Sequence, residues 1–190
     1  REELVLMRRA AAISVRAHAA AMAAVEPGMH EHELQAVLEY VFRRHGGEPA
    51  YESIVGAGAN ACVLHYRANS ARIDAGDMVL IDAGAEYMGY AADITRTFPA
   101  DGRFTPEQRA LHDVVCAAQR AALEEARPGV PFENVHRASV RVLGEGLLRL
   151  GLLKGDLRKV LAAESYRTFS PHKTGHWLGL DVHDVGEYRV

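Results

Sequence analysis

The sequence has few of the features that would anchor or cross-link it. Only two of its 190 residues are cysteines, Cys62 and Cys116, and they form no C-x-x-C pair. They indicate neither a disulfide framework nor a thiolate zinc site and fit a reducing compartment, so we expect a cytoplasmic protein. No apolar run approaches the roughly 20 residues that a membrane-spanning helix needs, and we therefore expect no membrane partner.

The sequence also lacks a large excess of charge of either sign. Its formal net charge of -3 leaves no basic surface for nucleic acid and no polybasic membrane patch. Hydrophobic residues make up 48% and charged residues 25%, as in an ordinary globular protein of one large domain or two small ones. The first residues include acids and have no apolar segment typical of a signal peptide. They also lack an initiator methionine, so we interpret the chain as a fragment or trimmed form.

Hydrophobic periodicity predicts four helices, over 2–25, 31–45, Thr105 to about 126, and about 132–150. Thr105, Pro106 and Gln108 form a capping pattern at the start of the third helix. Strands are expected at 51–56 and 62–66 and as two strands within 79–98, with strands and loops over 165–190.

A repeat is visible in the helical part of the sequence. EPGM at 26–29 and RPGV at 127–130 each separate two predicted helices. This similarity predicts two matched α-then-β halves, about 1–100 and 105–190, in a single pseudo-twofold α+β domain with helices covering one curved sheet. The final strands of the second half would then lie beyond the chain. A chance likeness of two helical hairpins is the alternative.

The stretch VLIDAGAEYMGYAADITRTF, residues 79–98, places Asp82 and Asp93 in strands where apolar residues would be expected. A hairpin folded about Tyr87–Met88 would set the two carboxylates directly opposite each other on one face. Two such carboxylates repel, and one would stay protonated unless divalent cations neutralise them. The alternative is that both aspartates cap turns or pair with Arg96.

Three of the ten histidines, His172, His176 and His183, lie close together in PHKTGHWLGLDVHDVGEY. The first two have the spacing of helical zinc proteases, but Lys173 stands where that motif needs glutamate, and a proline and a glycine disfavour a helix. We expect a loop that directs these histidines into a pocket. His65, in CVLHYRAN, is a fourth candidate. The other six are expected to be structural: His18, His30, His32, His45, His112 and His136.

These motifs resemble the aminopeptidase P (Xaa-Pro aminopeptidase) branch of the pita-bread metallopeptidase superfamily, M24, over essentially the whole chain. The resemblance rests on LHY at 64–66, IDAGAEYMGYAADITRTFP at 81–99 and HKTGHWLGLDVHDVG at 172–186. It implies the pita-bread fold and two divalent metal ions, typically Mn²⁺ with Co²⁺ or Zn²⁺ as alternatives. The ligands in the family are two aspartates, one histidine and two glutamates.

Carried over to this sequence, the resemblance makes Asp82, Asp93 and His176 metal ligands, with Asp93 contacting both ions. It makes His65, His172 and His183 the catalytic histidines around them. The two glutamates would lie in strands after the HDVG segment, which are the strands that the repeat predicts to be missing. Glu187 matches neither of them.

The resemblance implies an exopeptidase that removes the N-terminal residue from peptides with proline at the second position. We expect this activity, and a homo-oligomer, for the full-length parent; the activity of this chain alone stays open. Alternatives are a prolidase, a metal-free pita-bread binding scaffold, creatinase-like hydrolysis without metal, and a zincin protease. The acids and His176 argue against the metal-free alternatives, and the missing glutamate argues against the zincin.

Overall fold

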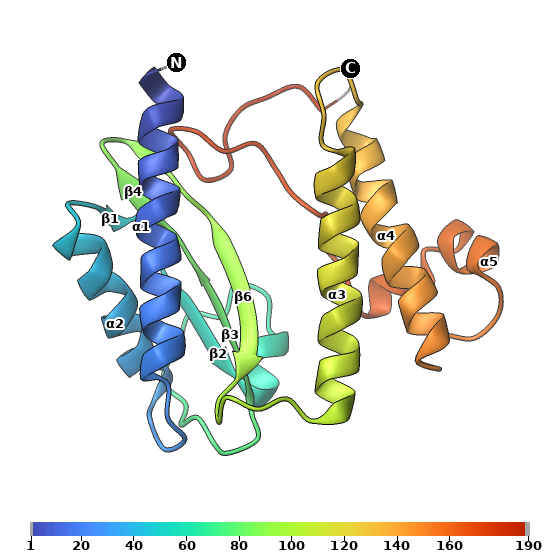
Figure 1. Ribbon diagram of the computed structural model, residues 1–190, viewed down its shortest axis with the longest axis horizontal. Coiled ribbons are helices and arrows are strands. Elements are labelled where there is room, and N and C mark those ends of the chain that lie inside the picture. Colours follow the sequence, from blue (N-terminus) through green and yellow to red (C-terminus); the bar gives the residue numbers. More distant parts are fainter. Residues whose placement is uncertain (1, 189–190) are drawn as a thin grey trace. The chain divides into compact units, whose positions relative to one another are not determined.

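The computed structural model describes residues 2–188 and divides them into two compact units (Figure 1). Of the described residues, the first unit comprises 2–103 together with 177–185, and the second comprises 104–176 together with 186–188. Within the described part of the chain, no helix has the length and apolarity needed to cross a membrane.

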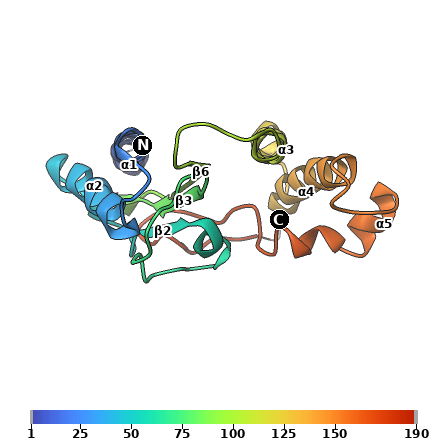
Figure 2. The same cartoon turned by 90° about the horizontal axis from the view of Figure 1, so that it is seen from below.

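The first unit begins with two helices, α1 (Glu2–Ala24) and α2 (Glu31–Arg44), as the periodicity predicts. The turn between them uses Gly28 at a φ of +104°, a conformation that glycine adopts without the steric penalty of a side chain. Apolar stripes of both helices, including Ile13 and Phe42, pack with strand residues such as Ile81 in one buried core. Figure 2 shows the two helices on the same face of the sheet.

Two small antiparallel sheets complete this unit. The order β2 (Ile54–Ala57), β3 (Met78–Ala83) and β6 (Ile94–Pro99) forms one sheet. The second has the order β1 (Glu48–Pro49), β4 (Ala85–Tyr87) and β5 (Tyr90–Ala91). The predicted strand at 62–66 is wrong, because the chain forms a 3₁₀ turn, η1 (Gly58–Cys62), followed by a loop in which His65 has a φ of +54°.

The predicted pairing of the two aspartates is also wrong in register. Asp82 lies opposite Thr95, and the hairpin turns at Met88 and Gly89 between the paired residues Tyr87 and Tyr90. Met88 and Gly89 both have positive φ, as the favoured two-residue hairpin turn requires. Because side chains alternate along a strand, a shift of two residues keeps both aspartates on the same face.

The second unit is helical in its described part. Its helices α3 (Pro106–Glu125) and α4 (Phe132–Arg149) confirm the prediction, as does the capping box of Thr105 with Gln108. Val114 packs so closely on Gly146 that a Cβ there would lie 2.3 Å from a Val114 methyl group. The connection again uses a glycine of positive φ, Gly129, so the helical part of the repeat is present in both units.

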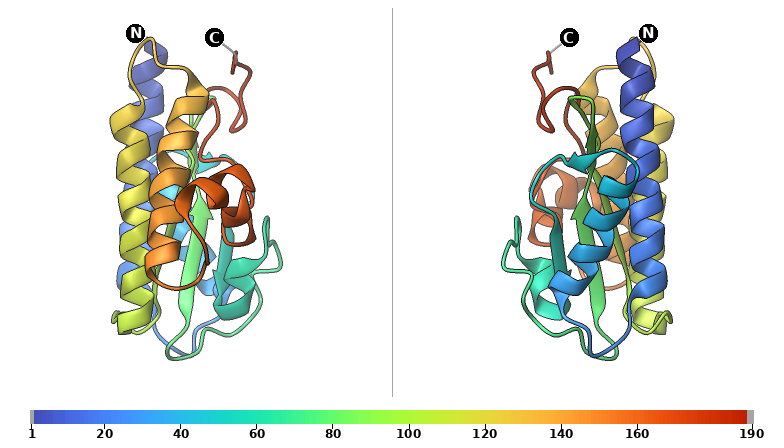
Figure 3. Two further views of the ribbon diagram at one scale, coloured as in Figure 1. Left: turned by 90° about the vertical axis from the view of Figure 1, so that its right-hand side faces the viewer. Right: turned by 90° about the vertical axis from the view of Figure 1, so that its left-hand side faces the viewer.

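The sequence pattern does not predict the short helix α5 (Leu157–Ala162), drawn in orange in Figure 3. The Asp156 carboxylate caps this helix by accepting from the Lys159 N–H at 3.0 Å. A 3₁₀ turn, η2 (Ser165–Thr168), follows. The expectation of strands after residue 165 is wrong for residues 165–188, which form this turn and loops. The grouping of both units into one catalytic domain stays a prediction.

Candidate functional site

The candidate site of the first unit is centred on Asp82, Asp93 and a residue that the sequence did not single out, Tyr51. The Tyr51 hydroxyl lies 2.5 Å from Oδ1 of Asp82 and 2.9 Å from Oδ1 of Asp93. All three side chains are half-buried. A hydroxyl carries a single proton, so it can donate to only one of the two carboxylates at a time.

The two carboxylates of this group lie close together and are partly buried, which disfavours a negative charge on both. Burial raises the pKa of Asp82, the hydrogen bond from Tyr51 opposes that rise, and the charge of Asp93 adds to it. Burial and the two carboxylates also raise the pKa of Tyr51, so its hydroxyl stays protonated. The pair of carboxylates therefore has a donor but needs positive charge, and its hard oxygen atoms suit a divalent cation.

The backbone beside the aspartates explains how they come together. A Cβ at Gly84 would lie 1.6 Å from the Ala92 carbonyl oxygen, so only glycine allows this approach of the two strands. The Gly84 carbonyl accepts a hydrogen bond from the Ala50 N–H at 2.9 Å. This bond places Ala50, and with it the next residue, Tyr51, beside Gly84. Gly84 thus marks where the chain passes from one sheet to the other, between Asp82 and Asp93 in the hairpin.

A pocket of about 210 Å³ opens at this point of the first unit. Two of the predicted catalytic histidines lie on its wall together with both predicted metal-binding aspartates. Its lining consists of Tyr51, Glu52, Ile54, His65, Arg67, Asp82, Asp93, Val182 and His183. The structure therefore brings together residues that are far apart in the sequence.

His183 lies in a loop that is closed on itself and attached to the sheet. The Asp184 N–H donates to the Trp177 carbonyl at 3.2 Å, and the Gly179 carbonyl accepts from the Ala91 N–H of β5 at 2.9 Å. A Cβ at Gly179 would lie 1.8 Å from the Asp184 carboxylate, so a larger residue at position 179 would force the Asp184 side chain to move. This closure fixes the loop that carries His183 against the strand adjacent to Asp93.

His172 and His176 belong to the second unit, where their segment is a loop, as expected, and not the helix of a zinc protease. Contacts with the start of α4 hold it. Nδ1 of the buried His136 lies 2.8 Å from Oγ1 of Thr174, and Nζ of Lys173 lies 3.6 Å from Oε2 of Glu133. His172 is exposed and His176 is half-buried.

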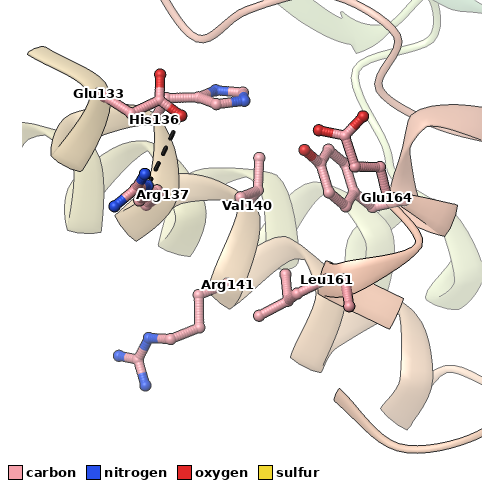
Figure 4. A pocket seen from close by; sticks show the side chains of 9 residues that line it. Glu133, His136, Arg137, Val140, Arg141, Leu161 and Glu164 are labelled. Atoms are coloured by element: carbon pink, nitrogen blue, oxygen red, sulfur yellow. Dashed lines mark ion pairs between the residues drawn. The ribbon is translucent and has the colours of Figure 1, made fainter. Parts of the chain in front are cut away.

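A second hollow, of about 530 Å³, lies in the second unit between α4 and the α5–η2 segment (Figure 4). Glu133 and Arg137 form an ion pair at 3.7 Å on its wall. Its lining contains none of the predicted ligands or catalytic histidines: Glu133, His136, Arg137, Val140, Arg141, Leu161, Ala162, Glu164 and Tyr166. We therefore place the candidate site at the smaller, acidic pocket.

Among residues 2–188, no three histidine, cysteine, aspartate or glutamate side chains are grouped as a complete set of metal ligands. Asp82 and Asp93 nevertheless fit a metal, because they supply two adjacent oxygen ligands whose repulsion a cation would relieve. Tyr51 could not be found from the sequence, since its position at the start of a predicted strand carries no recognisable motif. Its role depends on the hairpin and on Gly84.

Comparison with known proteins agrees with this geometry. Over 188 residues, the chain is 47% identical to the Xaa-Pro aminopeptidase of Escherichia coli, covering 98% of this chain and 43% of that protein. The Xaa-Pro aminopeptidase of Haemophilus influenzae is 44% identical over 187 residues, again 98% of this chain and 44% of that protein. The chain thus spans less than half the length of these curated relatives.

Solved structures show the same similarity in three dimensions. The structure of Pseudomonas aeruginosa aminopeptidase PepP matches with a TM-score of 0.97 and 56% identity, covering 99% of this chain and 43% of that one. Zinc-substituted E. coli aminopeptidase P matches with a TM-score of 0.95 and 46% identity, covering 98% and 43%. The fold is therefore that of aminopeptidase P, as the resemblance predicted. Since residues 5–190 also match metallopeptidase family M24, the chain belongs to that family.

Proposed function

We propose that the full-length protein is a metal-dependent Xaa-Pro aminopeptidase, which removes the N-terminal residue from peptides with proline at the second position. The observation that carries the proposal is the pair Asp82 and Asp93, held by Tyr51 in a pocket with His65 and His183. This pocket occurs in a chain 47% identical to a Xaa-Pro aminopeptidase.

Asp82, Asp93 and His176 are the proposed metal ligands of this chain, and two Mn²⁺ ions are the proposed cofactor. Oxygen-rich ligation with a single histidine suits a hard ion such as Mn²⁺, although a zinc-substituted form of the E. coli relative exists. When bound, such ions supply Lewis acidity that lowers the pKa of water and polarises a peptide carbonyl.

The histidines of the chain position the peptide in this proposal. His65 and His183 line the pocket and present imidazole groups at its wall. We place His65, like His176, beside the metal ions. We assign His172 and His183 to hydrogen bonds with the substrate carbonyl and with the negative charge that develops on its oxygen. The Tyr51 hydroxyl lies within hydrogen-bonding distance of both aspartates and so holds the two carboxylates beside each other.

Structures of a related protein support these residue assignments. Four structures of E. coli aminopeptidase P each have one histidine replaced by alanine. Those four histidines have the same spacing along their chain as His65, His172, His176 and His183 have here. A fifth structure has a glutamate replaced and a bound substrate, and at the same offset this glutamate falls after residue 190. That position agrees with the proposal that the glutamate ligands follow the HDVG segment.

A cytoplasmic location and a homo-oligomeric full-length protein complete the proposal. The location rests on the low cysteine content, and the oligomer rests on the family resemblance. The formal net charge of -3 does not favour a nucleic acid partner, and the family resemblance makes a peptide the proposed partner at the site.

The experiment measures metal content and peptide cleavage by the full-length protein. We expect release of the first residue from Xaa-Pro-Xaa tripeptides in the presence of Mn²⁺, and loss of both bound metal and cleavage in the Asp82→Asn, Asp93→Asn double variant. Cleavage restricted to Xaa-Pro dipeptides would identify a prolidase instead. Full activity of the double variant would refute the proposed site.

A further inference from the structure

Glu31, the first residue of α2, has a carboxylate that is completely buried although it does not line the candidate pocket. Each of its two oxygens accepts two hydrogen bonds. Oε1 accepts from the Ala57 N–H at 2.9 Å and from Nδ2 of Asn60 at 3.0 Å. Oε2 accepts from the Tyr66 hydroxyl at 2.8 Å and from the Ala71 N–H at 2.9 Å.

These hydrogen bonds keep the carboxylate ionised. Burial raises the pKa of Glu31, but the bonds from Asn60, Ala57, Tyr66 and Ala71 together outweigh burial and lower it. The position at the N-terminus of α2 favours a negative charge as well. An ionised group in the interior is costly unless it is fully hydrogen-bonded, so its presence calls for a structural reason.

The four donors show what Glu31 holds. Ala57 and Asn60 lie at the start of the loop that follows β2, whereas Tyr66 and Ala71 lie toward its end. Nδ2 of Asn60 also donates to the Tyr66 hydroxyl at 3.0 Å. Glu31 therefore joins both ends of the loop that runs from residue 58 to residue 71.

This loop carries His65, which directly precedes Tyr66. His65 has a φ of +54°, a left-handed conformation that residues other than glycine adopt rarely and only when their surroundings impose it. A second buried anchor, Asn69, also has a positive φ and accepts from the Val55 N–H at 3.0 Å through its side chain. The loop is thus fixed on both sides of His65, on the wall of the pocket that contains Asp82 and Asp93.

We propose that Glu31 is a positioning residue for the proposed peptidase site: its buried carboxylate holds the 58–71 loop in the conformation that presents His65 to the pocket of Asp82 and Asp93. The role of His65 in this statement rests on the proposed function. Glu31 acts at a distance, through Tyr66, and touches neither metal nor substrate. Its loss affects turnover through His65 and leaves the ligands Asp82 and Asp93 in place.

Tyr66→Phe is the variant that tests this proposal, because it removes one donor to Glu31 and keeps the ring. Tyr40→Phe is the matched control, since the Tyr40 hydroxyl accepts from Arg44 at 3.0 Å on the exposed side of α2. In the full-length protein without metal, we expect Tyr66→Phe to accelerate amide hydrogen exchange in residues 58–71 about tenfold. Tyr40→Phe should leave that exchange unchanged.

The second measurement is a double-mutant cycle on kcat with a Xaa-Pro tripeptide. We expect Tyr66→Phe to lower kcat about tenfold at unchanged metal content, and to lower it no further in the His65→Ala background. A purely structural role would give losses that add. Additive losses, or unchanged exchange in residues 58–71, would overturn the proposal.

Glu31→Gln should disturb the 58–71 loop more than Tyr66→Phe does. The NH₂ group of the amide cannot accept hydrogen bonds, so two of the four donors would lose their acceptor. The exchange measurement needs neither metal nor substrate, so it decides whether Glu31 holds the loop even if the proposed function fails. Failure of the wild-type protein to cleave any Xaa-Pro peptide would refute the proposed function alone.

Discussion

At the scale of single residues, the hydroxyl of Tyr51 takes the place that positive charge would fill between Asp82 and Asp93. It lies within hydrogen-bonding distance of both carboxylates, and burial keeps it protonated. A metal ion would neutralise the same two groups more completely than one hydroxyl can. The importance of Tyr51 for stability should therefore depend on whether metal is bound.

Replacing Tyr51 by phenylalanine should destabilise the metal-free protein by about 1.5 kcal/mol, the lower end for a hydrogen bond to a charged group, because the site is only half-buried. With saturating Mn²⁺ the loss should be smaller. Urea unfolding with chelator and with Mn²⁺ measures both values, and Tyr40→Phe serves as the control. Equal losses in the two conditions would contradict the argument.

The histidines of the site should affect turnover more than metal binding. His172→Ala or His183→Ala should lower kcat by about 10²–10³, the usual effect of removing one donor to a developing negative charge. Metal content should stay near the wild-type value. His32→Ala, at an exposed position on α2, is the control and should leave kcat unchanged. Unchanged turnover in both site variants would refute their assigned role.

At the scale of secondary structure elements, the start of α4 holds the segment that carries His172 and His176. The contact between His136 and Thr174, at 2.8 Å, is shorter than the ion pair of Lys173 with Glu133, at 3.6 Å. Burial, together with the charge of Lys173, lowers the pKa of His136, so the ring is neutral when it makes this contact. The hydroxyl of Thr174 should therefore contribute more than the methyl group of Thr174 to holding residues 171–176 in place.

We expect Thr174→Val to accelerate amide exchange over residues 171–176 about fivefold, which corresponds to the loss of one ordinary hydrogen bond. Thr174→Ser keeps the hydroxyl and should restore protection. Hydrogen exchange followed by mass spectrometry measures both variants, with a peptide from α1 as the internal reference. Equal behaviour of the valine and serine variants would show that the hydroxyl has no part in holding the segment.

The elements also show how far the sequence could predict the fold. Long amphipathic helices and the cap at Thr105 follow from local patterns, and the structure confirms them. The register of the hairpin does not follow from a local pattern, because it depends on Met88 and Gly89 both adopting positive φ. The sequence pattern predicts a strand around His65, but the structure has a loop there, because a distant carboxylate, that of Glu31, holds both ends of this segment. The short α5 has too few residues for a periodic signal.

At the scale of the whole molecule, the site combines residues that follow local motifs with residues placed only by tertiary structure. Asp82, Asp93 and the histidines could be selected from the sequence because the family motifs contain them. Tyr51 and Glu31 could not, since their roles arise from partners more than 20 positions away along the chain. The chain covers 43% of the E. coli relative. Whether these residues together form a metal site is therefore best tested in the full-length protein.

Metal binding at Asp82 and Asp93 should stabilise the full-length protein, because a ligand that binds only the folded state shifts the unfolding equilibrium. At a free Mn²⁺ concentration about 100 times the dissociation constant, the gain should be about 2.7 kcal/mol for one site. Thermal unfolding after chelation and after Mn²⁺ titration measures this gain. The Asp82→Asn, Asp93→Asn double variant should lose it, whereas Asp113→Asn, at an exposed position on α3, should keep it. A double variant that Mn²⁺ still stabilises fully would place the metal elsewhere in the protein.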